Sequence, residues 1–358
     1  MIIKSLKLRN FRNYESLYMT FDPHLNVFTG ENAQGKTNLL ESLVYLSLTR
    51  SHRIADDKKL IRDQMPFADI RCVCEENGKQ KEMEAVIHPK GKTLIVHHQP
   101  VSRSSEFVGI LNTVLFAPDD LRLFSDSPKD RRRMMNQEIT KVSSAYLLSL
   151  NRFQSFLKER NLILKRPVPD VALLDTLDVQ MAKEEAVIIE MRKHFVDTLN
   201  QYMRTMYQKI AGEDCDVAIV YRCCNDSFGQ EDILKKHQEY RKKDIDSRVT
   251  SFGIHREDIL FTMKDRPITD LASQGQKRMV MLAFKLSLLE YIRSMTGKEP
   301  VLLLDDVLSE LDQTRQKRLL SLVSSPYQCM ITATEVPSFL KNKKITEFHI
   351  ENGIIHKL

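Results

Sequence analysis

The glycine-rich stretch FTGENAQGKTNLLES, residues 28–42, constrains the fold of this chain more than any other segment. Gly30 and Gly35 permit backbone conformations and close approaches that a side chain would block, so successive N–H groups can surround phosphate oxygens. In this spacing Lys36 reaches the outer phosphates of a nucleotide, and the Thr37 hydroxyl coordinates Mg²⁺. A short apolar run precedes the loop, and leucines at helical spacing follow it. This strand–loop–helix order predicts a nucleotide-binding α/β body.

Length and composition restrict the class of protein. The 358 residues are enough for two domains, or for one domain that carries a large insertion. No stretch approaches the roughly 20 apolar residues of a membrane span, and the first residues carry frequent charges, unlike a secretory signal. We therefore expect a soluble, cytoplasmic protein with no membrane partner. The net charge of +6 permits an anionic partner such as nucleic acid without requiring one.

The cysteines are expected to have no chemical role. There are six, and Cys223 and Cys224 are neighbours in the chain. Their spacings fit neither ordinary disulfides nor a zinc ribbon. The sequence therefore predicts reduced cysteines that act mostly as small packing residues, without a metal.

Strand patterns dominate the first third of the chain. Period-two and short apolar runs predict two or three strands ahead of the glycine loop. Residues 68–101 read as antiparallel strands with turns at Asn77-Gly78 and Lys90-Gly91, and a further strand is expected at 112–116. These strands place the glycine loop in a body that contains extended sheet.

Helical patterns replace the strands from about residue 128. Apolar residues keep helical spacing over 128–164 and again over 173–210, with a proline-containing turn between them. Strand and helix patterns alternate again over 249–263 and 300–334, and the charged run at 235–244 is expected to be solvated.

The predicted organisation is an α/β body interrupted by a mainly helical lobe. Residues 1–125 are expected to form the first part of the body, 126–245 the lobe, and 246–358 the second part of the body.

A second motif, PVLLLDDVLSELD, lies at residues 300–312. Its four apolar residues predict a buried strand that ends in Asp305 and Asp306. A carboxylate at the end of such a strand is what a magnesium-bound nucleotide requires, and Asp306 would lie nearer the attacking water. The alternative is a buried strand followed by a solvated acidic turn. Its combination with the glycine loop favours the nucleotide site.

A third motif, LASQGQKRMVMLAFKLSLLE, begins at residue 271. Ser273 and Gly275 stand at the start of an amphipathic helix, where N–H groups attract an anion. One subunit already has a loop for the phosphates, so a second phosphate-facing helix end is most useful if it closes over the nucleotide of another subunit. The alternative is an ordinary capped core helix.

Together these motifs resemble the RecF family, which belongs to the SMC-like members of the ABC-type ATPases. The resemblance rests on five segments in order, which are Leu8 to Tyr14, Gly253 to Asp258, Ser273 to Gln276, Asp305-Asp306 and Ser309 to Asp312. It implies an ABC-type ATPase head, a P-loop NTPase fold, with the helical lobe inserted, and it implies ATP and Mg²⁺ as ligands. The switch histidine that transporter ATPases carry after the corresponding strand is missing after Met330, which is consistent with slow hydrolysis.

The resemblance also implies residue roles. Asp305 and Thr37 hold Mg²⁺, and Asp306, Lys36 and Ser273 take part in hydrolysis. Ser273 and Gly275 contact the γ-phosphate of ATP on a partner subunit. The implied ATP-binding residues of the same subunit are Arg12, Asn13, Gly30, Glu31, Asn32, Ala33, Gln34, Gly35, Lys36 and Thr37.

Three functions compete for these motifs. A P-loop kinase of small molecules leaves Ser273 to Gln276 without a role, and in a transporter ATPase the signature follows the glycine loop far sooner than here. A DNA clamp explains both the signature and the helical insertion. The resemblance implies an ATP-dependent homodimer and weak ATPase that acts with a RecR-type mediator at single-strand gaps and junctions of single- and double-stranded DNA. It would help to load recombinase and would support DNA repair, replication and the SOS response to DNA damage.

Overall fold

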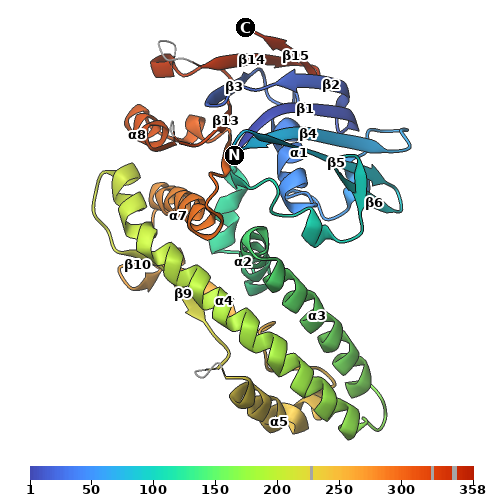
Figure 1. The fold of residues 1–358 in the computed structure, drawn as a ribbon. Coiled ribbons are helices and arrows are strands. Elements are labelled where there is room, and N and C mark those ends of the chain that lie inside the picture. The colour runs from blue at the N-terminus through green and yellow to red at the C-terminus, as the bar shows by residue number, and fades with distance from the viewer. Residues whose placement is uncertain (226–228, 324–325, 341–344) are drawn as a thin grey trace. The chain divides into compact units, whose positions relative to one another are not determined.

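The computed structural model describes residues 1–225, 229–323, 326–340 and 345–358 (Figure 1). Its contacts divide the chain into two compact units, each built from separate segments of the sequence. The first unit comprises residues 1–121, 205–214 and 278–358, and the second comprises 122–204 and 215–277. Within the described residues, no helix has both the length and the apolar character that crossing a membrane requires.

The first unit contains an antiparallel sheet with the strand order β2-β1-β4-β5-β6-β7. Side chains alternate between buried and more exposed along β4, so one face of this sheet packs in the core. The predicted turns at Asn77-Gly78 and Lys90-Gly91 are confirmed. The strands are β1 (Ile2–Phe11), β2 (Tyr14–Thr20), β4 (Ala68–Glu76), β5 (Lys79–His88), β6 (Gly91–Val96) and β7 (Gln99–Val101).

A second sheet of the first unit carries both nucleotide motifs. Its order is β15-β14-β3-β13-β12-β8, and every pair except β14–β15 is parallel. Strands β3 and β12 lie on either side of β13, and both run parallel to it. The segments that follow β3 and β12 therefore meet at the same edge of the sheet. The strands are β3 (Leu25–Thr29), β8 (Thr113–Phe116), β12 (Val301–Asp305), β13 (Cys329–Thr332), β14 (Thr346–Glu351) and β15 (Ile354–Lys357).

Helix α1 (Lys36–Leu48) follows the glycine loop, as predicted. It contacts β8, β12 and β13 of the parallel sheet and also β4 and β5 of the antiparallel sheet. All of its leucines except the half-buried Leu48 are fully buried, in a cluster shared with residues of both sheets such as Leu6 and Leu303. Apolar burial on both sides therefore fixes the start of α1, where Lys36 and Thr37 lie.

The second unit contains a pair of long helices and a small sheet. Helices α3 (Ser144–Leu164) and α4 (Val171–Ala211) run antiparallel and are joined by the predicted proline-containing turn (Figure 1). Their ends share a cluster of Ile163, Leu164, Leu174 and Leu177. The sheet, in the order β11-β10-β9, consists of β9 (Val217–Arg222), β10 (Asp258–Met263) and β11 (Arg266–Pro267).

The other helices complete the chain. They are α2 (Pro128–Val142), α5 (Gln230–Ser247), α6 (Ile268–Leu271), α7 (Gln274–Thr296) and α8 (Gln313–Val323). Short 3₁₀ helices are η1 (Asp57–Leu60), η2 (Ser104–Glu106), η3 (Pro118–Phe124), η4 (Leu308–Glu310) and η5 (Ser338–Leu340).

Two expectations for the helical region are wrong in detail. The stretch 128–164 is two helices, because Ser143 is extended (φ −140°) and its side chain caps α3 by accepting a hydrogen bond from the Tyr146 N–H. The charged run 235–244 is part of α5, and two of its members, His237 and Asp244, are buried. They pair with Glu185 and Arg160 of other helices, which sequence spacing does not indicate.

The second unit extends past the predicted lobe boundary at residue 245, up to Lys277. The reason is that β10 pairs with β9 along its full length and cannot leave that sheet. The division into head and lobe with boundaries at 125 and 245 stays a prediction.

Candidate functional site

The glycine loop and the acidic pair line one pocket in the first unit. Its volume is about 360 Å³. The residues that line it are Asn32, Ala33, Gly35, Lys36, Thr37, Asn38, Arg53, Asp305, Asp306 and Thr332. Segments nearly 270 residues apart in sequence, represented by Thr37 and Asp305, are joined by a hydrogen bond of 3.0 Å.

Both glycines of the loop are required by its backbone. Gly30 has φ 139° and Gly35 has φ 117°, a region that side chains rarely adopt. A Cβ at Gly35 would lie 2.6 Å from Nδ2 of Asn13, and a Cβ at Gly30 would collide with the Ile350 carbonyl oxygen. The backbone therefore requires glycine at both positions, as expected for a loop whose N–H groups surround an anion.

Lys36 lies at the centre of the loop. Its ammonium group donates hydrogen bonds to the carbonyl oxygens of Gly30 and Glu31, the second at 2.7 Å. Burial lowers the pKa of Lys36, whereas the nearby carboxylates of Asp306 and Asp305 raise it and offset part of that effect. A positive charge is thus held where the outer phosphates of a nucleotide would lie.

Asp305 lies at the end of β12 and is only 6% exposed. Its Oδ1 accepts hydrogen bonds from the hydroxyl groups of Thr37, at 3.0 Å, and Thr332, at 2.8 Å. Burial raises its pKa, so its charge lacks full compensation from the protein. A carboxylate beside a hydroxyl is a set of hard oxygen donors, which suits Mg²⁺. Thr37 and Asp305 therefore fit the predicted metal site.

Asp306 has a left-handed backbone conformation, with φ 52°, which is uncommon outside glycine. Its N–H donates to the Thr332 hydroxyl at 2.9 Å, which fixes this turn after β12. The side chain lines the pocket with Lys36 and Asp305. A strained, partly exposed carboxylate in this place can orient or activate a water molecule.

The predicted phosphate contacts Arg12 and Asn13 do not line the pocket. The Arg12 guanidinium makes two hydrogen bonds of 2.9 Å to Glu41 of α1, which is fully buried. Asn13 donates to the Gln34 carbonyl oxygen at 3.0 Å and accepts from Asn38 at 2.9 Å. In this structure both residues stabilise the loop and α1 through hydrogen bonds outside the pocket. A direct contact with ATP stays a prediction.

Arg53 is a lining residue that sequence reasoning did not identify. It follows α1 without belonging to a recognisable motif. Its guanidinium donates to the Asn38 side-chain oxygen at 3.1 Å and remains 42% exposed. Arg53 therefore adds a second cation beside Lys36, in a position available to phosphate oxygens.

Ser273 and Gln276 form a reciprocal cap at the start of α7. The Ser273 N–H donates to the Gln276 side-chain oxygen at 2.9 Å, and the Gln276 N–H donates to the Ser273 hydroxyl at 3.3 Å. Ser273 and Gly275 are exposed, and a Cβ at Gly275 would meet no atom within 4 Å. The capped-helix alternative is correct as local structure, and the contact with a partner's nucleotide stays a prediction.

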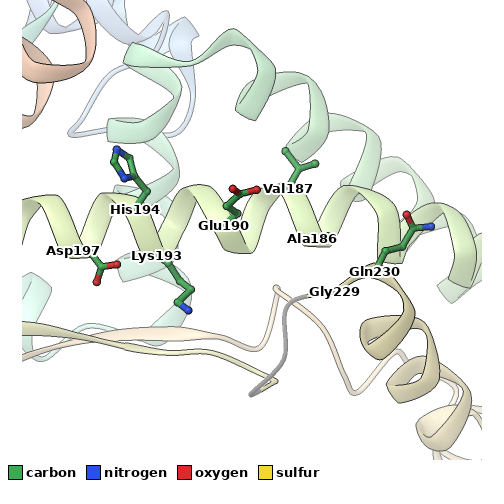
Figure 2. Close-up of a pocket in the computed structure, with 8 residues that line it drawn as sticks. All are labelled: Ala186, Val187, Glu190, Lys193, His194, Asp197, Gly229 and Gln230. Carbon is green, nitrogen blue, oxygen red and sulfur yellow. The ribbon is translucent and has the colours of Figure 1, made fainter.

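A larger cavity of about 650 Å³ lies along α4 in the second unit (Figure 2). Figure 2 shows that Glu190 and His194 project to one side of the helix, whereas Lys193 and Asp197 project to the other. The side chains therefore do not converge on a common point. Convergent chemistry distinguishes the smaller pocket of the first unit, and we regard that pocket as the candidate functional site.

Comparison with known proteins agrees with this geometry. Residues 2–356 match the family model "RecF/RecN/SMC N terminal domain". The chain is 38% identical over 370 residues to the DNA replication and repair protein RecF of Listeria monocytogenes serotype 4b, with full coverage of both chains. It is 36% identical to the protein of the same name from Lactobacillus johnsonii, with 99% of each chain covered.

Solved structures give the same result. The chain matches a structure of the recombination mediator protein RecF with ATP, described as part of the RecFOR pathway, with a TM-score of 0.91 and 29% identity. That match covers 100% of this chain and 97% of the other. An SMC head bound to the winged-helix domain of ScpA matches with a TM-score of 0.58 and 15% identity, which supports the fold alone. The predicted fold class, an ABC-type ATPase head, is confirmed.

Proposed function

The chain belongs to the RecF family of DNA replication and repair proteins, and on that basis we propose that it is an ATP-dependent DNA clamp of recombinational repair. The observation that carries this proposal is the composition of the nucleotide pocket. Its lining includes two cations, a hydroxyl group and two carboxylates, which are the groups that phosphates and a divalent metal require, and the exposed turn at Ser273 and Gly275 would provide a second set of phosphate-binding groups. Two copies of the chain would complete two nucleotide sites.

Each site would bind one ATP with Mg²⁺. The loop from Gly30 to Thr37 would surround the phosphates, and Lys36 and Arg53 would neutralise their charge. Thr37 and Asp305 would hold Mg²⁺, which supplies further charge neutralisation when bound. The ATP-bound relative supports this assignment.

Hydrolysis would be slow and would serve to reset the clamp. Asp306 would accept a hydrogen bond from the attacking water and orient it toward the γ-phosphate. Ser273 and Gly275 of the partner subunit would bind that phosphate, so its loss would remove contacts that hold the dimer together. The energy of hydrolysis would then set the lifetime of the closed state.

The clamp would act on DNA with a RecR-type partner in the cytoplasm. We propose that it recognises single-strand gaps and junctions of single- and double-stranded DNA, helps to load recombinase, and supports replication and the SOS response. The relative's assignment to the RecFOR pathway supports a shared partner set. Binding through Lys and Arg to phosphates would be strongly salt-dependent.

The proposal is tested by measuring the mass of the protein in solution with and without ATP, Mg²⁺ and a gapped duplex. We expect a dimer with ATP and Mg²⁺, and tighter DNA binding in that state. A monomer in every condition would contradict the clamp and would favour a P-loop kinase.

Lys36→Ala is the matching variant, because it removes the ammonium from the centre of the loop. We expect ATP-dependent dimerisation to weaken by about 100-fold or more, the effect of losing one strong charged donor in a dry site. Lys58→Ala, which changes an exposed lysine outside the pocket, should leave dimerisation unchanged. ATP-dependent dimers of Lys36→Ala would disprove the switch.

A further inference from the structure

Three potential metal ligands meet in the second unit, away from every motif discussed so far. The Sγ atoms of Cys223 and Cys224 lie 3.2 Å and 3.1 Å from the same atom, Oε1 of Glu257. All three ligand atoms lie within 4.8 Å of one another. Among the described residues, no other group of three or more His, Cys, Asp or Glu side chains is gathered in this way.

The small sheet creates this arrangement. Strand β9 ends at Arg222, and its register pairs Arg222 with Asp258, the first residue of β10. The next residues outward on the two strands are therefore Cys223 and Glu257. Cys223 and Cys224 are 34 and 33 positions away from Glu257 in the sequence. The pairing of the strands therefore brings the two thiols to the carboxylate.

A second layer of residues fixes the carboxylate. Glu257 is almost fully buried, and its Oε2 accepts hydrogen bonds from the Arg192 guanidinium, at 2.5 Å, and from the Tyr221 hydroxyl. Oε2 is thus occupied, and Oε1 is the oxygen that faces the thiols. Metal-binding side chains are commonly oriented by outer partners of this kind.

The site also has room for an ion and a solvent ligand. The cysteines and Glu257 line a cavity of about 410 Å³. Arg222 and Arg256 lie in the same lining. Two sulfurs, one carboxylate oxygen and one solvent molecule make a four-coordinate set that suits Zn²⁺ and related thiophilic ions.

We propose that Cys223, Cys224 and Glu257 bind a thiophilic divalent cation of the Zn²⁺ class. Binding would release the two thiol protons and place two thiolates and one carboxylate around the ion, with Arg192 balancing the carboxylate. The cation would tie the end of β9 to the start of β10. This site is independent of the nucleotide pocket and of the clamp proposal.

The chain contains a natural control for this site. Cys72 and Cys74 are neighbours on one face of β4, and both are buried. Within the described part of the chain they do not belong to any group of three potential ligands. If two adjacent thiols were sufficient, this pair would also bind the ion.

The test is a titration of the reduced, full-length protein with Co²⁺, which reports thiolate ligands by their charge-transfer absorption. We expect one equivalent of Co²⁺ to bind with a thiolate band and with release of two protons, and Zn²⁺ to displace the Co²⁺ without further proton release. Cys72→Ser/Cys74→Ser should keep the band. Cys223→Ser/Cys224→Ser should lose it while retaining the wild-type circular dichroism spectrum.

Tyr221, which contacts Glu257 but not the proposed ion, provides a test with a smaller expected effect. Tyr221→Phe removes only the hydroxyl that orients Glu257 and should weaken Zn²⁺ binding by about 10-fold. Absence of a thiolate band in the reduced wild type would overturn the proposal. So would its persistence in Cys223→Ser/Cys224→Ser, or its loss in the Cys72→Ser/Cys74→Ser control.

Discussion

The acidic groups of the nucleotide pocket and those buried in the second unit are compensated in opposite ways. In the second unit, Arg160 is fully buried and pairs with Asp178 and Asp244, each at 2.7 Å. In the pocket, Asp305 receives hydrogen bonds from two hydroxyl groups and lies beside Asp306. The first arrangement pairs each carboxylate directly with a cation, whereas the hydroxyl groups that hydrogen-bond to Asp305 are neutral.

The pKa values show the same contrast. Burial raises the pKa of Asp305, and its hydrogen bonds only reduce that effect. Burial also acts to raise the pKa of Glu257, but the Arg192 charge and hydrogen bonds outweigh it, and the pKa falls below its ordinary value. The charge of Glu257 is thus stabilised by the protein itself, whereas that of Asp305 would be stabilised by a cation from outside, as expected at a nucleotide site.

The largest expected effect is on ATP hydrolysis. Asp306→Asn keeps the size and the backbone hydrogen bond of Asp306 but removes its charge. We expect the hydrolysis rate to fall by about 1,000-fold, within the usual range for losing a general base. ATP binding and ATP-dependent dimers, measured by nucleotide titration and light scattering, should remain. Hydrolysis at the wild-type rate would exclude Asp306 from the reaction.

The next effect is on stability and lies in the second unit. Arg160→Ala leaves Asp178 and Asp244 buried without their partner and should lower the free energy of unfolding by about 3–5 kcal/mol. Urea unfolding measures this change. Lys236→Ala removes the exposed pair with Glu239 and should lower it by less than about 1 kcal/mol. An equal loss in the free energy of unfolding for the two variants would show that burial does not determine how much an ion pair contributes to stability.

Ser273→Arg should affect association without affecting the fold. Ser273 is exposed, so the monomer can accommodate the longer side chain. A bulky cation at the dimer surface should weaken ATP-dependent dimerisation by roughly 100-fold, as an unfavourable charge costs a few kcal/mol at a tight interface. ATP binding to the monomer should stay unchanged. Weaker ATP binding by the monomer would instead assign this turn to its own subunit.

The smallest expected effect is an increase in stability. Asp305→Asn should raise the Tm of the nucleotide-free protein, with a gain of about 1 kcal/mol in the free energy of unfolding, because it removes an uncompensated buried charge. The raised pKa of Asp305 means that its contribution to stability is complete below pH 3.8 and is lost as the pH rises through the folded-state pKa. The gain should therefore be measurable at pH 7 and absent in acid.

Glu257→Gln is the control for Asp305→Asn, because it should lower the stability of the protein at neutral pH. The lowered pKa of Glu257 means that its contribution is present above pH 4.5 and is lost as the pH falls through the folded-state pKa. The variant should therefore be less stable than the wild type at pH 7, and the difference should shrink in acid. Destabilisation by both substitutions would remove the distinction between the two kinds of carboxylate.

Local motifs could be predicted from the sequence, whereas long-range partners could not. The glycine loop, the strand before Asp305 and the hairpin turns follow from residue types at short spacing, and they are present as expected. Arg53 and the buried pairs of α5 were missed, because hydrophobic periodicity assigns every charge to solvent. The break at Ser143 was missed because one extended residue does not disturb the apolar spacing.

The predicted cysteine chemistry illustrates the same point. The spacing of Cys223 and Cys224 fits neither an ordinary disulfide nor a zinc ribbon, so packing was the reasonable expectation. Only the pairing of β9 with β10 brings Glu257 to them. No motif in the sequence specifies this pairing.

The position of β3 between β13 and β14 has a consequence for how the protein is made. The glycine loop leaves the ribosome early, but among the described residues the strand that supports it pairs with β13 (Cys329–Thr332) and β14 (Thr346–Glu351). Nearly 300 further residues must be synthesised before this strand can pair with β13. A nascent chain therefore cannot complete the sheet next to the glycine loop until synthesis has passed β14, which would restrict the proposed ATP cycle to chains of nearly full length.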